Sequence, residues 1–183
     1  MPATAADALT DHVIAVISES GLDGLSIRTV ANRADVSIGA VQYHFPTKAA
    51  LLRAAMRTVA QRSAERFRQA ESVSDEPGKL GALLSLLVPA GPDDDTARVW
   101  VAFSARALTD PEIGAVYRDI WERLRSALVT LIGATAGLAE DAERRASQVL
   151  ALADGLTVNV LAGTISAPEG RRIITDSVFS DLV

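Results

Sequence analysis

Apolar residues recur along most of the chain at intervals of about three or four positions, the period of one helix face, whereas strict alternation of apolar and polar residues is rare. The first predicted helix, over residues 5–20, places four apolar residues on one face: Leu9, Val13, Val16 and Ile17. Gly21 follows it as a left-handed stop. The chain is therefore predicted to be all-α.

Capping residues divide the next part of the chain into short helices. The side-chain oxygen of an N-cap residue accepts a hydrogen bond from the first free backbone N–H groups of a helix. Three such residues precede predicted helices over residues 27–34, 38–44 and 48–70: Ser26, Ser37 and Thr47. Pro46 cannot extend the second of these helices, so it separates the second from the third.

Turn-rich segments beyond residue 70 separate an apolar stretch over residues 80–88 from four later helices. These helices are predicted over residues 93–108, 110–134, 139–163 and 166–183, which brings the total to about nine. Three consecutive acids, Asp93, Asp94 and Asp95, begin the first of the four and complement its dipole. A divalent-cation site is the alternative, but consecutive side chains in a helical turn point in different directions.

The last two predicted helices carry more apolar surface than a single neighbouring helix covers. The helix over residues 139–163 is apolar on nearly every side. The helix over residues 166–183 adds Ile173, Ile174, Val178 and Phe179. This surplus predicts a four-helix contact between two identical subunits, and burial in the core of one subunit is the alternative.

The composition restricts the chemistry that the chain can perform. Of its 183 residues, 49% are hydrophobic and 22% are charged, which is typical of a folded domain. The absence of cysteine excludes disulfides, thiolate metal sites and cysteine nucleophiles. The first nine residues lack a basic region, and the longest nearly apolar stretch, residues 80–90, is far shorter than the roughly 18 residues of a membrane span. We expect a cytoplasmic protein with no membrane partner.

Charge is distributed unevenly along the chain, although the formal net charge is −5. Residues 26–70 contain eight bases and two acids, whereas residues 71–183 contain ten bases and seventeen acids. A basic segment can meet a phosphate backbone while an acidic remainder is repelled from it. The segment is thus a candidate for nucleic-acid binding, and ordinary helix surface charge is the alternative.

The basic segment begins with two short helices joined by a tight turn and preceded by a longer helix, which is the helix-turn-helix plan. In it the second helix enters the major groove. Three apolar residues, Val36, Val41 and Phe45, are expected to face inward and to hold this helix against Val30 and Ala31.

Outward positions of the second helix carry small or mildly polar residues, which would allow it to lie deep in a groove: Ile38, Gly39, Ala40 and Gln42. Gln42 can pair bidentately with adenine, and Ile38 or Ala40 can contact a thymine methyl group. At the end of the helix a hydroxyl, an imidazole, a helix N-terminus and an ammonium group come together and suit phosphate binding: Tyr43, His44, Thr47 and Lys48.

The segment resembles the DNA-binding domain of the TetR family of transcriptional repressors. The resemblance covers residues 13–52 and is most specific at Val36, Ser37, Gly39, Tyr43, His44, Phe45, Lys48 and Leu51, with Thr29 and Ala31 upstream. It implies that Arg28 reaches a base and that the aromatic–histidine pair and the lysine contact phosphates. Two departures are Asp35, where glycine is frequent, and Gln42, where an aromatic residue is common. The implied DNA-contacting set is Arg28, Ser37, Ile38, Gly39, Ala40, Gln42, Tyr43, His44, Thr47 and Lys48.

Residues 97–182 are similar to the C-terminal domain of the BetI-like branch of that family. This resemblance implies that the last two helices form the homodimer and that helices five to eight enclose a pocket for a small-molecule effector. It places a DNA-binding domain over residues 1–47 and a ligand-binding and dimerisation domain over residues 48–183.

Candidate ligand-binding residues follow from the side chains in this region. Four of the chain's aromatic residues fall on two neighbouring predicted helices, and two polar residues interrupt the apolar penultimate helix: Trp100, Phe103, Tyr117, Trp121, Asp154 and Asn159. Aromatic faces bind cations, so a cage for a quaternary ammonium such as choline is one possibility. Ordinary core packing is the alternative for each aromatic residue, and a satisfied structural role is the alternative for Asp154 and Asn159.

No enzymatic motif accompanies these features. His12 and His44 are the only imidazoles, and the chain contains no nucleophile elbow, phosphate loop or zinc-binding helix motif. We expect neither a catalytic site nor a metal or cofactor. The predicted function is a ligand-responsive repressor that binds a palindromic operator in double-stranded DNA as a homodimer. An activator or architectural DNA-binding protein, a small-molecule carrier without DNA binding, and a helical enzyme are the alternatives.

Overall fold

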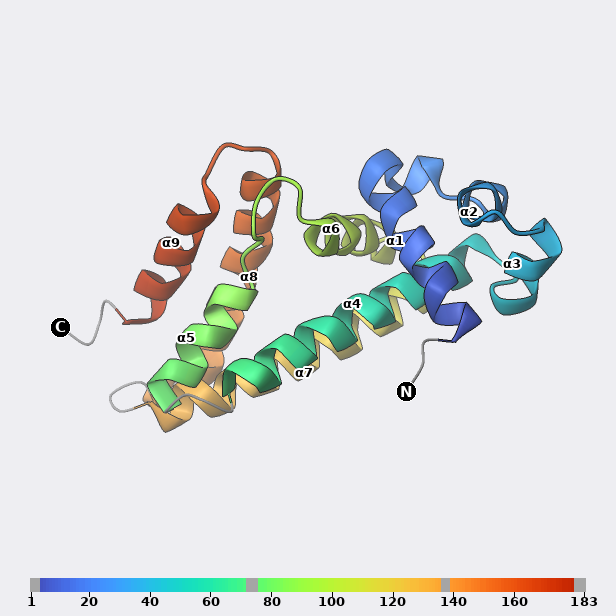
Figure 1. Cartoon of the computed structure of the whole chain (residues 1–183). Helices are drawn as coiled ribbons and strands as arrows, with labels where there is room; N and C mark the ends of the chain where they lie inside the picture. Colours follow the sequence, from blue (N-terminus) through green and yellow to red (C-terminus); the bar gives the residue numbers. More distant parts are fainter. Residues whose placement is uncertain (1–3, 72–75, 136–138, 180–183) are drawn as a thin grey trace. The chain divides into compact units, whose positions relative to one another are not determined.

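The computed structural model describes residues 4–71, 76–135 and 139–179, and these residues form nine α-helices and one short 3-10 helix without any strand (Figure 1). The all-α prediction is confirmed. The helices are α1 (Ala5–Gly24), α2 (Ile27–Ala34), α3 (Ile38–His44), α4 (Lys48–Glu71), α5 (Glu76–Leu86), α6 (Asp95–Ala107), α7 (Pro111–Ala134), η1 (Ala139–Asp141), α8 (Ala142–Leu161) and α9 (Ala167–Phe179). Among the described residues, no helix is long and apolar enough to cross a membrane.

The predicted N-caps fix where the short helices begin. The Ser26 side chain accepts a hydrogen bond from the Thr29 backbone N–H at 3.0 Å, and α2 starts at the next residue. Ser37 accepts from the Ala40 N–H at 3.1 Å, and Thr47 accepts from the Ala50 N–H at the same distance. Each cap satisfies a backbone donor that the first helical turn leaves free, which is why these boundaries follow from local sequence.

Two residues with left-handed backbone shape the first three helices. Asp35 ends α2 at φ 53° and ψ 45°, a conformation that aspartate tolerates better than most residues. Gly21 has φ 63° and ψ −168°, a combination open essentially to glycine only. The regular part of the first helix ends at Gly21 as predicted, and a second short helical segment follows this kink as far as Gly24.

Acidic side chains organise the start of α6 and α7. The helix predicted from residue 93 begins at Asp95, and Asp94 instead accepts a hydrogen bond from the Ala90 N–H at 2.8 Å in the preceding turn. Asp110 accepts from the backbone N–H groups of Ile113 and Glu112 at the start of α7. These bonds, the Ile113 N–H foremost, hold the pKa of the Asp110 carboxyl below its ordinary value.

The chain folds as two compact units. The first comprises Met1–Gln61 and Asp95–Tyr117, and the second comprises Arg62–Asp94 and Arg118–Val183. Both units draw on segments far apart in the chain. The boundary predicted between residues 47 and 48 separates a DNA-binding domain from a ligand-binding and dimerisation domain. It differs from the division into compact units and stays a prediction.

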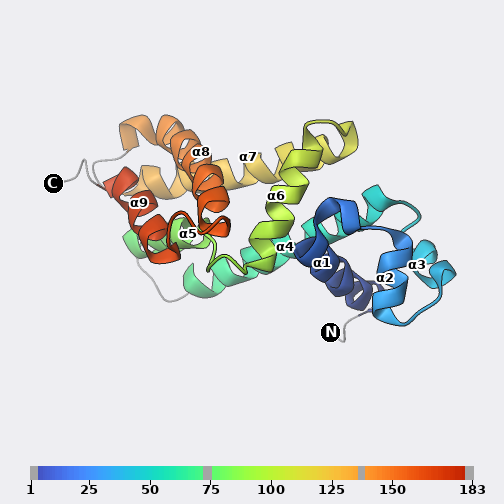
Figure 2. The ribbon, with the colours of Figure 1, turned by 90° about the horizontal axis from the view of Figure 1, so that it is seen from above.

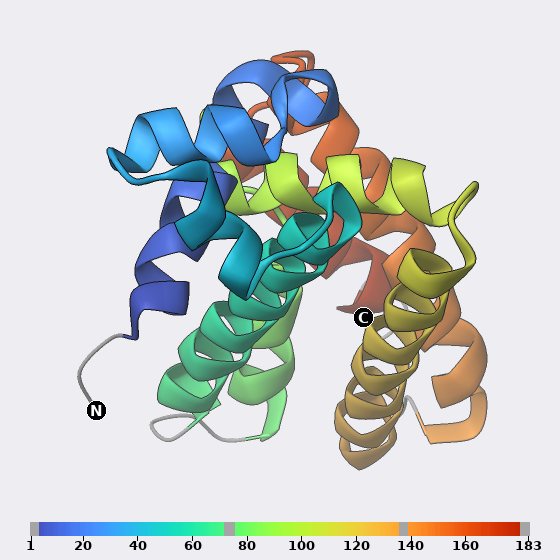
Figure 3. The same cartoon turned by 90° about the vertical axis from the view of Figure 1, so that its right-hand side faces the viewer.

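The core of the first unit joins α1, α2 and α3 to the start of α4, to α6 and to the start of α7. α1 packs against α2 and α6, and α2 packs against α3 (Figure 3). Fully buried side chains in this unit include Val13, Leu25, Val30, Val41, Leu51, Met56, Phe103 and Ile113. The helix-turn-helix is thus one part of a larger hydrophobic assembly.

In the second unit, α9 packs against both α8 and α5, and these three helices lie together in Figure 2. Its core includes Leu80, Leu84, Leu128, Ile132, Ala146, Leu156, Val160 and Ile174. Gly170 on α9 allows a close approach, because a β-carbon there would lie 3.1 Å from a methyl group of Val88.

One predicted core position is wrong. Val36 was expected to face inward, yet its side chain is 41% exposed, whereas Val41 and Phe45 are buried as predicted. Val36 lies in the turn between α2 and α3, where its backbone N–H donates to the Ala31 carbonyl at 3.1 Å. The backbone bond therefore holds this position in place, and the side chain is left at the surface.

Candidate functional site

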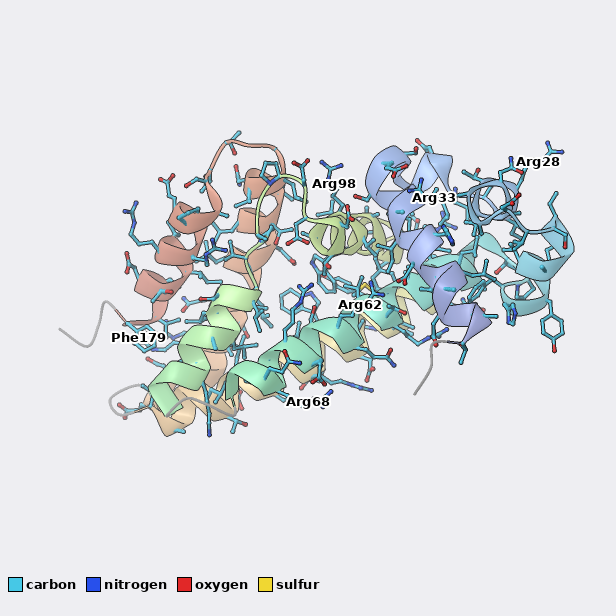
Figure 4. The ribbon with its side chains drawn as sticks, viewed as in Figure 1. Arg28, Arg33, Arg62, Arg68, Arg98 and Phe179 are labelled. Atoms are coloured by element: carbon cyan, nitrogen blue, oxygen red, sulfur yellow. The ribbon has the colours of Figure 1, made fainter. Side chains whose placement is uncertain are left out.

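Every residue of the predicted DNA-contacting set is exposed to solvent. The set comes from three consecutive elements, α2, α3 and the start of α4, together with the turns between them. Arg28 on α2 extends away from the helices (Figure 4). The whole set belongs to the first unit, so the core of that unit alone positions it.

The α3 helix exposes nearly all of its residues. Val41 is its one buried residue, and Ile38 and Tyr43 are 43% and 84% exposed. Both side chains are therefore available for contact with a partner. An exposed surface of this kind, on a short helix fixed from behind, is what a recognition helix needs for contact with base edges.

Glycine at position 39 is not required by the fold. It lies inside α3 with ordinary helical backbone, and a β-carbon there would meet only the Ser37 hydroxyl, at 3.8 Å. Glycine inside a helix costs about 0.5–1 kcal/mol relative to alanine. The protein itself thus leaves room for a side chain at position 39.

The aromatic–histidine pair is anchored on one side. Tyr43 and His44 meet edge to face with ring centroids 5.0 Å apart, and His44 lies 6.2 Å from the ring of Phe45. Phe45 is buried, so it fixes the backbone from which the two polar rings project. Both the tyrosine hydroxyl and the imidazole can donate hydrogen bonds to phosphate oxygens.

Lys48 combines two roles that the sequence did not connect. Its ammonium group donates a hydrogen bond to the Leu22 backbone carbonyl, just past the kink in α1. An ammonium group has three N–H donors, so two remain for an anion. The bond to Leu22 thereby orients the lysine while it ties the start of α4 to the end of α1.

Several bases of the positive segment are paired with acids inside the protein. Arg33 binds Glu19 through both of its terminal nitrogens, at 2.6 and 2.8 Å. These hydrogen bonds hold the pKa of the Arg33 guanidinium above its ordinary value. Arg53 pairs with Glu112, and Arg68 pairs with Glu65. Charge counting along the sequence could not reveal these pairs, because two of the three acids lie outside the segment.

Three of the candidate ligand-binding aromatics cluster in the first unit. The rings of Trp100 and Tyr117 are stacked with centroids 5.2 Å apart, and Phe103 lies 6.4 Å from Tyr117. Phe103 is fully buried and serves the core, whereas Trp100 and Tyr117 are partly exposed. Stacking occupies one face of each of these two rings.

The other three candidates belong to the second unit. Trp121 packs partly buried against its core, and Asp154 is partly exposed. Asn159 is exposed, donates to the Gly155 carbonyl at 2.8 Å and accepts from the Thr164 hydroxyl at 2.8 Å. These bonds give Asn159 a structural role at the end of α8.

The helix α8 is apolar as well as exposed along part of its outer face, toward the C-terminal end. Its buried face is turned to the core, while Ala151, Gly155 and Val158 recur at helical spacing on the opposite side. Val158 is 55% exposed, and a β-carbon at Gly155 would meet nothing within 4 Å. The small residues leave room for another helix to approach closely.

Comparison with known proteins finds matches over nearly the whole chain. Residues 9–55 match the model described as bacterial regulatory proteins of the tetR family. Residues 78–180 match the model of the C-terminal domain of BetI-type transcriptional repressors. The two matches fall on the helix-turn-helix and on the C-terminal helices, respectively.

Individual relatives agree with the family models. The transcriptional regulator BetI of Burkholderia mallei is 34% identical over 162 residues, which cover 85% of this chain and 81% of BetI. The regulator PksA of Bacillus subtilis is 30% identical, with 90% of this chain and 83% of PksA covered. A transcriptional regulator from Rhodococcus sp. RHA1 has a solved structure with a TM-score of 0.87 and 30% identity, covering 97% of both chains.

A regulator from Saccharomonospora viridis, solved in complex with choline, shares the fold with a TM-score of 0.83 at 23% identity, covering 97% of this chain and 95% of its own.

The Gly39→Ala variant tests whether position 39 faces a partner. We expect the variant to be more stable by about 0.5–1 kcal/mol in urea denaturation, because alanine favours the helix and has room. Its affinity for duplex DNA carrying the recognition site should nevertheless fall about tenfold, the equivalent of one lost base contact. Gly81→Ala is the matched control, since that glycine is also helical with open space around it, and it should gain stability without losing affinity. Unchanged affinity in Gly39→Ala would contradict this assignment.

Proposed function

Because the chain belongs to the TetR family of bacterial transcriptional regulators, we propose that it is a cytoplasmic repressor that binds a palindromic operator as a homodimer and is released by a small molecule. The observation that carries the proposal is the exposed surface of α3, held from behind by Val41 and Phe45. It is joined to the polar groups at the start of α4. Base contacts from α3 and phosphate contacts from α4 together suffice for sequence-specific binding.

The assignment as a repressor is tested directly. The DNA that flanks the coding region of the protein supplies the first candidate operators. A gel mobility-shift assay measures binding to it, and a reporter gene behind the same DNA should be transcribed less when the protein is present. Increased transcription would instead identify an activator, and absence of binding to any flanking segment would count against the proposal.

Homodimerisation is supported by the outer face of α8. The apolar side chain of Val158 and the open position at Gly155 lie where a second copy of the helix could pack. Ile173 and Phe179 on α9 are partly buried against the core of the unit and keep apolar surface. Two such helices from each subunit form a four-helix contact with twofold symmetry, which matches an inverted repeat in DNA.

Effector binding is supported by the aromatic side chains of the C-terminal half. Trp100 and Tyr117 are partly exposed aromatic residues, and an apolar or cationic small molecule binds aromatic rings. Release from DNA requires that the effector favour a conformation different from the one that DNA favours. By linkage, operator DNA must then weaken effector binding by the same factor, typically about 5- to 150-fold.

Replacement of Lys48 tests the DNA contacts. We expect Lys48→Ala to weaken binding to all DNA sequences and to lower the slope of log affinity against log salt by about 0.9, one phosphate contact. Gln42→Ala should instead cost about 1–3 kcal/mol at particular base pairs only. Fluorescence anisotropy at several salt concentrations gives both values. Arg68→Ala, which removes a base paired with Glu65, is the control with an unchanged slope. A full slope in Lys48→Ala would mean that Lys48 serves α1 alone.

Val158→Glu tests the dimer. A carboxylate on the outer face of α8 would have to be buried between two subunits, so the variant should sediment as a monomer at micromolar concentration while the parent protein sediments as a dimer. Leu108→Glu is the matched control, because Leu108 is an 87% exposed apolar residue outside α8 and α9. A dimeric Val158→Glu protein would place the interface elsewhere.

Tryptophan fluorescence tests the effector site, since Trp100 and Trp121 are the only tryptophans. A compound that releases the protein from DNA should change the emission of Trp100 in a Trp121→Phe background. Choline is a suitable first probe because a quaternary ammonium binds aromatic faces. Release without a change in the emission of Trp100 would exclude the site described here.

A further inference from the structure

The C-terminal part of α1, residues 18–22, is held by side chains from three other helices of the first unit. From α6, Arg98 donates to the Ser18 backbone carbonyl at 2.9 Å, and the Ser18 hydroxyl donates to the Asp95 carboxylate. α6 therefore binds this segment through both the backbone carbonyl and the side-chain hydroxyl of Ser18. Figure 3 shows α6 passing beside α1.

The next residues of the same segment are bound by the DNA-binding elements. Glu19 accepts two hydrogen bonds from Arg33 at the end of α2, and the Leu22 carbonyl accepts a hydrogen bond from Lys48 at the start of α4. Arg98 on α6 and Arg33 on α2 are labelled beside α1 in Figure 4. One short stretch of α1 thus has partners on α6, α2 and α4.

The geometry makes these bonds act together. Ser18 and Glu19 are consecutive in a helix, where neighbouring residues are about 1.5 Å apart along the axis and cannot move independently. Single exposed polar contacts contribute little to stability, so five hydrogen bonds with four side chains would not be expected to gather on residues 18–22 by need of stability alone. The segment also contains Gly21, whose left-handed backbone ends the regular part of α1.

We propose that Arg98 and Asp95 are positioning residues for DNA binding, which act through residues 18–22 of α1 on α2 and on the start of α4. Neither residue belongs to the predicted DNA-contacting surface. They hold Ser18, Ser18 fixes Glu19, and Glu19 fixes Arg33 on the first helix of the helix-turn-helix. The inference rests on the proposed DNA binding for its functional meaning, but the mechanical connection is a property of the first unit by itself.

The proposal differs from a simple loss of stability in two measurable ways. Arg98 and Arg33 bond different residues of α1, so if they acted independently their effects on DNA affinity would add. If both arginines act through the same segment of α1, replacing the second arginine should lower DNA affinity little once the first has been replaced. A positioning residue also leaves the number of phosphate contacts unchanged, so the salt dependence of binding should keep its slope.

The experiment is a double-mutant cycle with Arg98→Met and Arg33→Met, in which methionine keeps the apolar stem and removes the donors. Operator affinity is measured at several salt concentrations, at a temperature where all variants are folded. Each single variant should bind about fivefold more weakly with an unchanged salt slope, and the double variant should bind no more than about fivefold more weakly in total. Arg98→Lys, which keeps one charged donor, should recover part of the affinity.

Amide hydrogen exchange of the DNA-free protein provides a second measurement. Arg98→Met should increase exchange in α2 and at the start of α4 as well as in α1 and α6. Arg106→Met is the matched control, because it breaks another exposed ion pair of α6, the one with Asp110 at 3.3 Å, without touching α1. The control should leave exchange in α2 and DNA affinity unchanged.

Three results would overturn the proposal. They are additive effects of Arg98→Met and Arg33→Met on affinity, an increase in exchange that stops at α1 and α6, and an equal effect of the Arg106→Met control. Failure of the parent protein to bind any DNA would refute the proposed function instead, and the exchange measurement would still decide whether the connection through α1 exists.

Discussion

The seven residues of α3 are too few to form a stable helix alone in water, so the recognition surface depends on the burial of Val41 and Phe45 behind it. Val41 is the single buried residue of α3, and Val30 and Ala31 on α2 complete the contact region. Caps and turns define where the helix begins and ends, but this apolar contact decides which face points outward. It therefore places the polar residues that α3 carries, Gln42, Tyr43 and His44.

Basic residues in the first unit serve two different purposes. Arg28 extends into solvent, where it can meet DNA, whereas Arg33 and Arg53 pair with acids from α1 and α7. Lys48 shares features of both groups, because one N–H of its ammonium group donates to the Leu22 carbonyl and two N–H groups remain. The positive charge of a segment is therefore an upper limit on its charge toward phosphate, and the acids of the surrounding helices set the real value.

The organisation into compact units bears on regulation. α6 comes from the region assigned by sequence to ligand binding, yet it packs in the same unit as the helix-turn-helix and contacts α1. A helix shared in this way makes any change at Trp100, which lies on α6, a change inside the unit that carries the DNA-contacting residues. The proposed effector site at Trp100 is then separated from α1 by one contact between two helices, so the proposed coupling to DNA binding would need no long pathway.

The sequence alone determined the all-α fold, the starts of α2, α3 and α4, and the family, because N-caps, helical spacing and the helix-turn-helix signature are local patterns. It also located the exposed α3 residues, since a helix that buries only Val41 and ends at a buried Phe45 has little choice of face. The error at Val36 arose where periodicity breaks down, in a turn whose side chain is directed by backbone bonds. Only the tertiary structure decided which charges pair, as in Glu19 with Arg33, and which aromatics stack, as in Trp100 with Tyr117. Such contacts join residues distant in the chain, and their partners depend on how helices pack, which no local pattern contains.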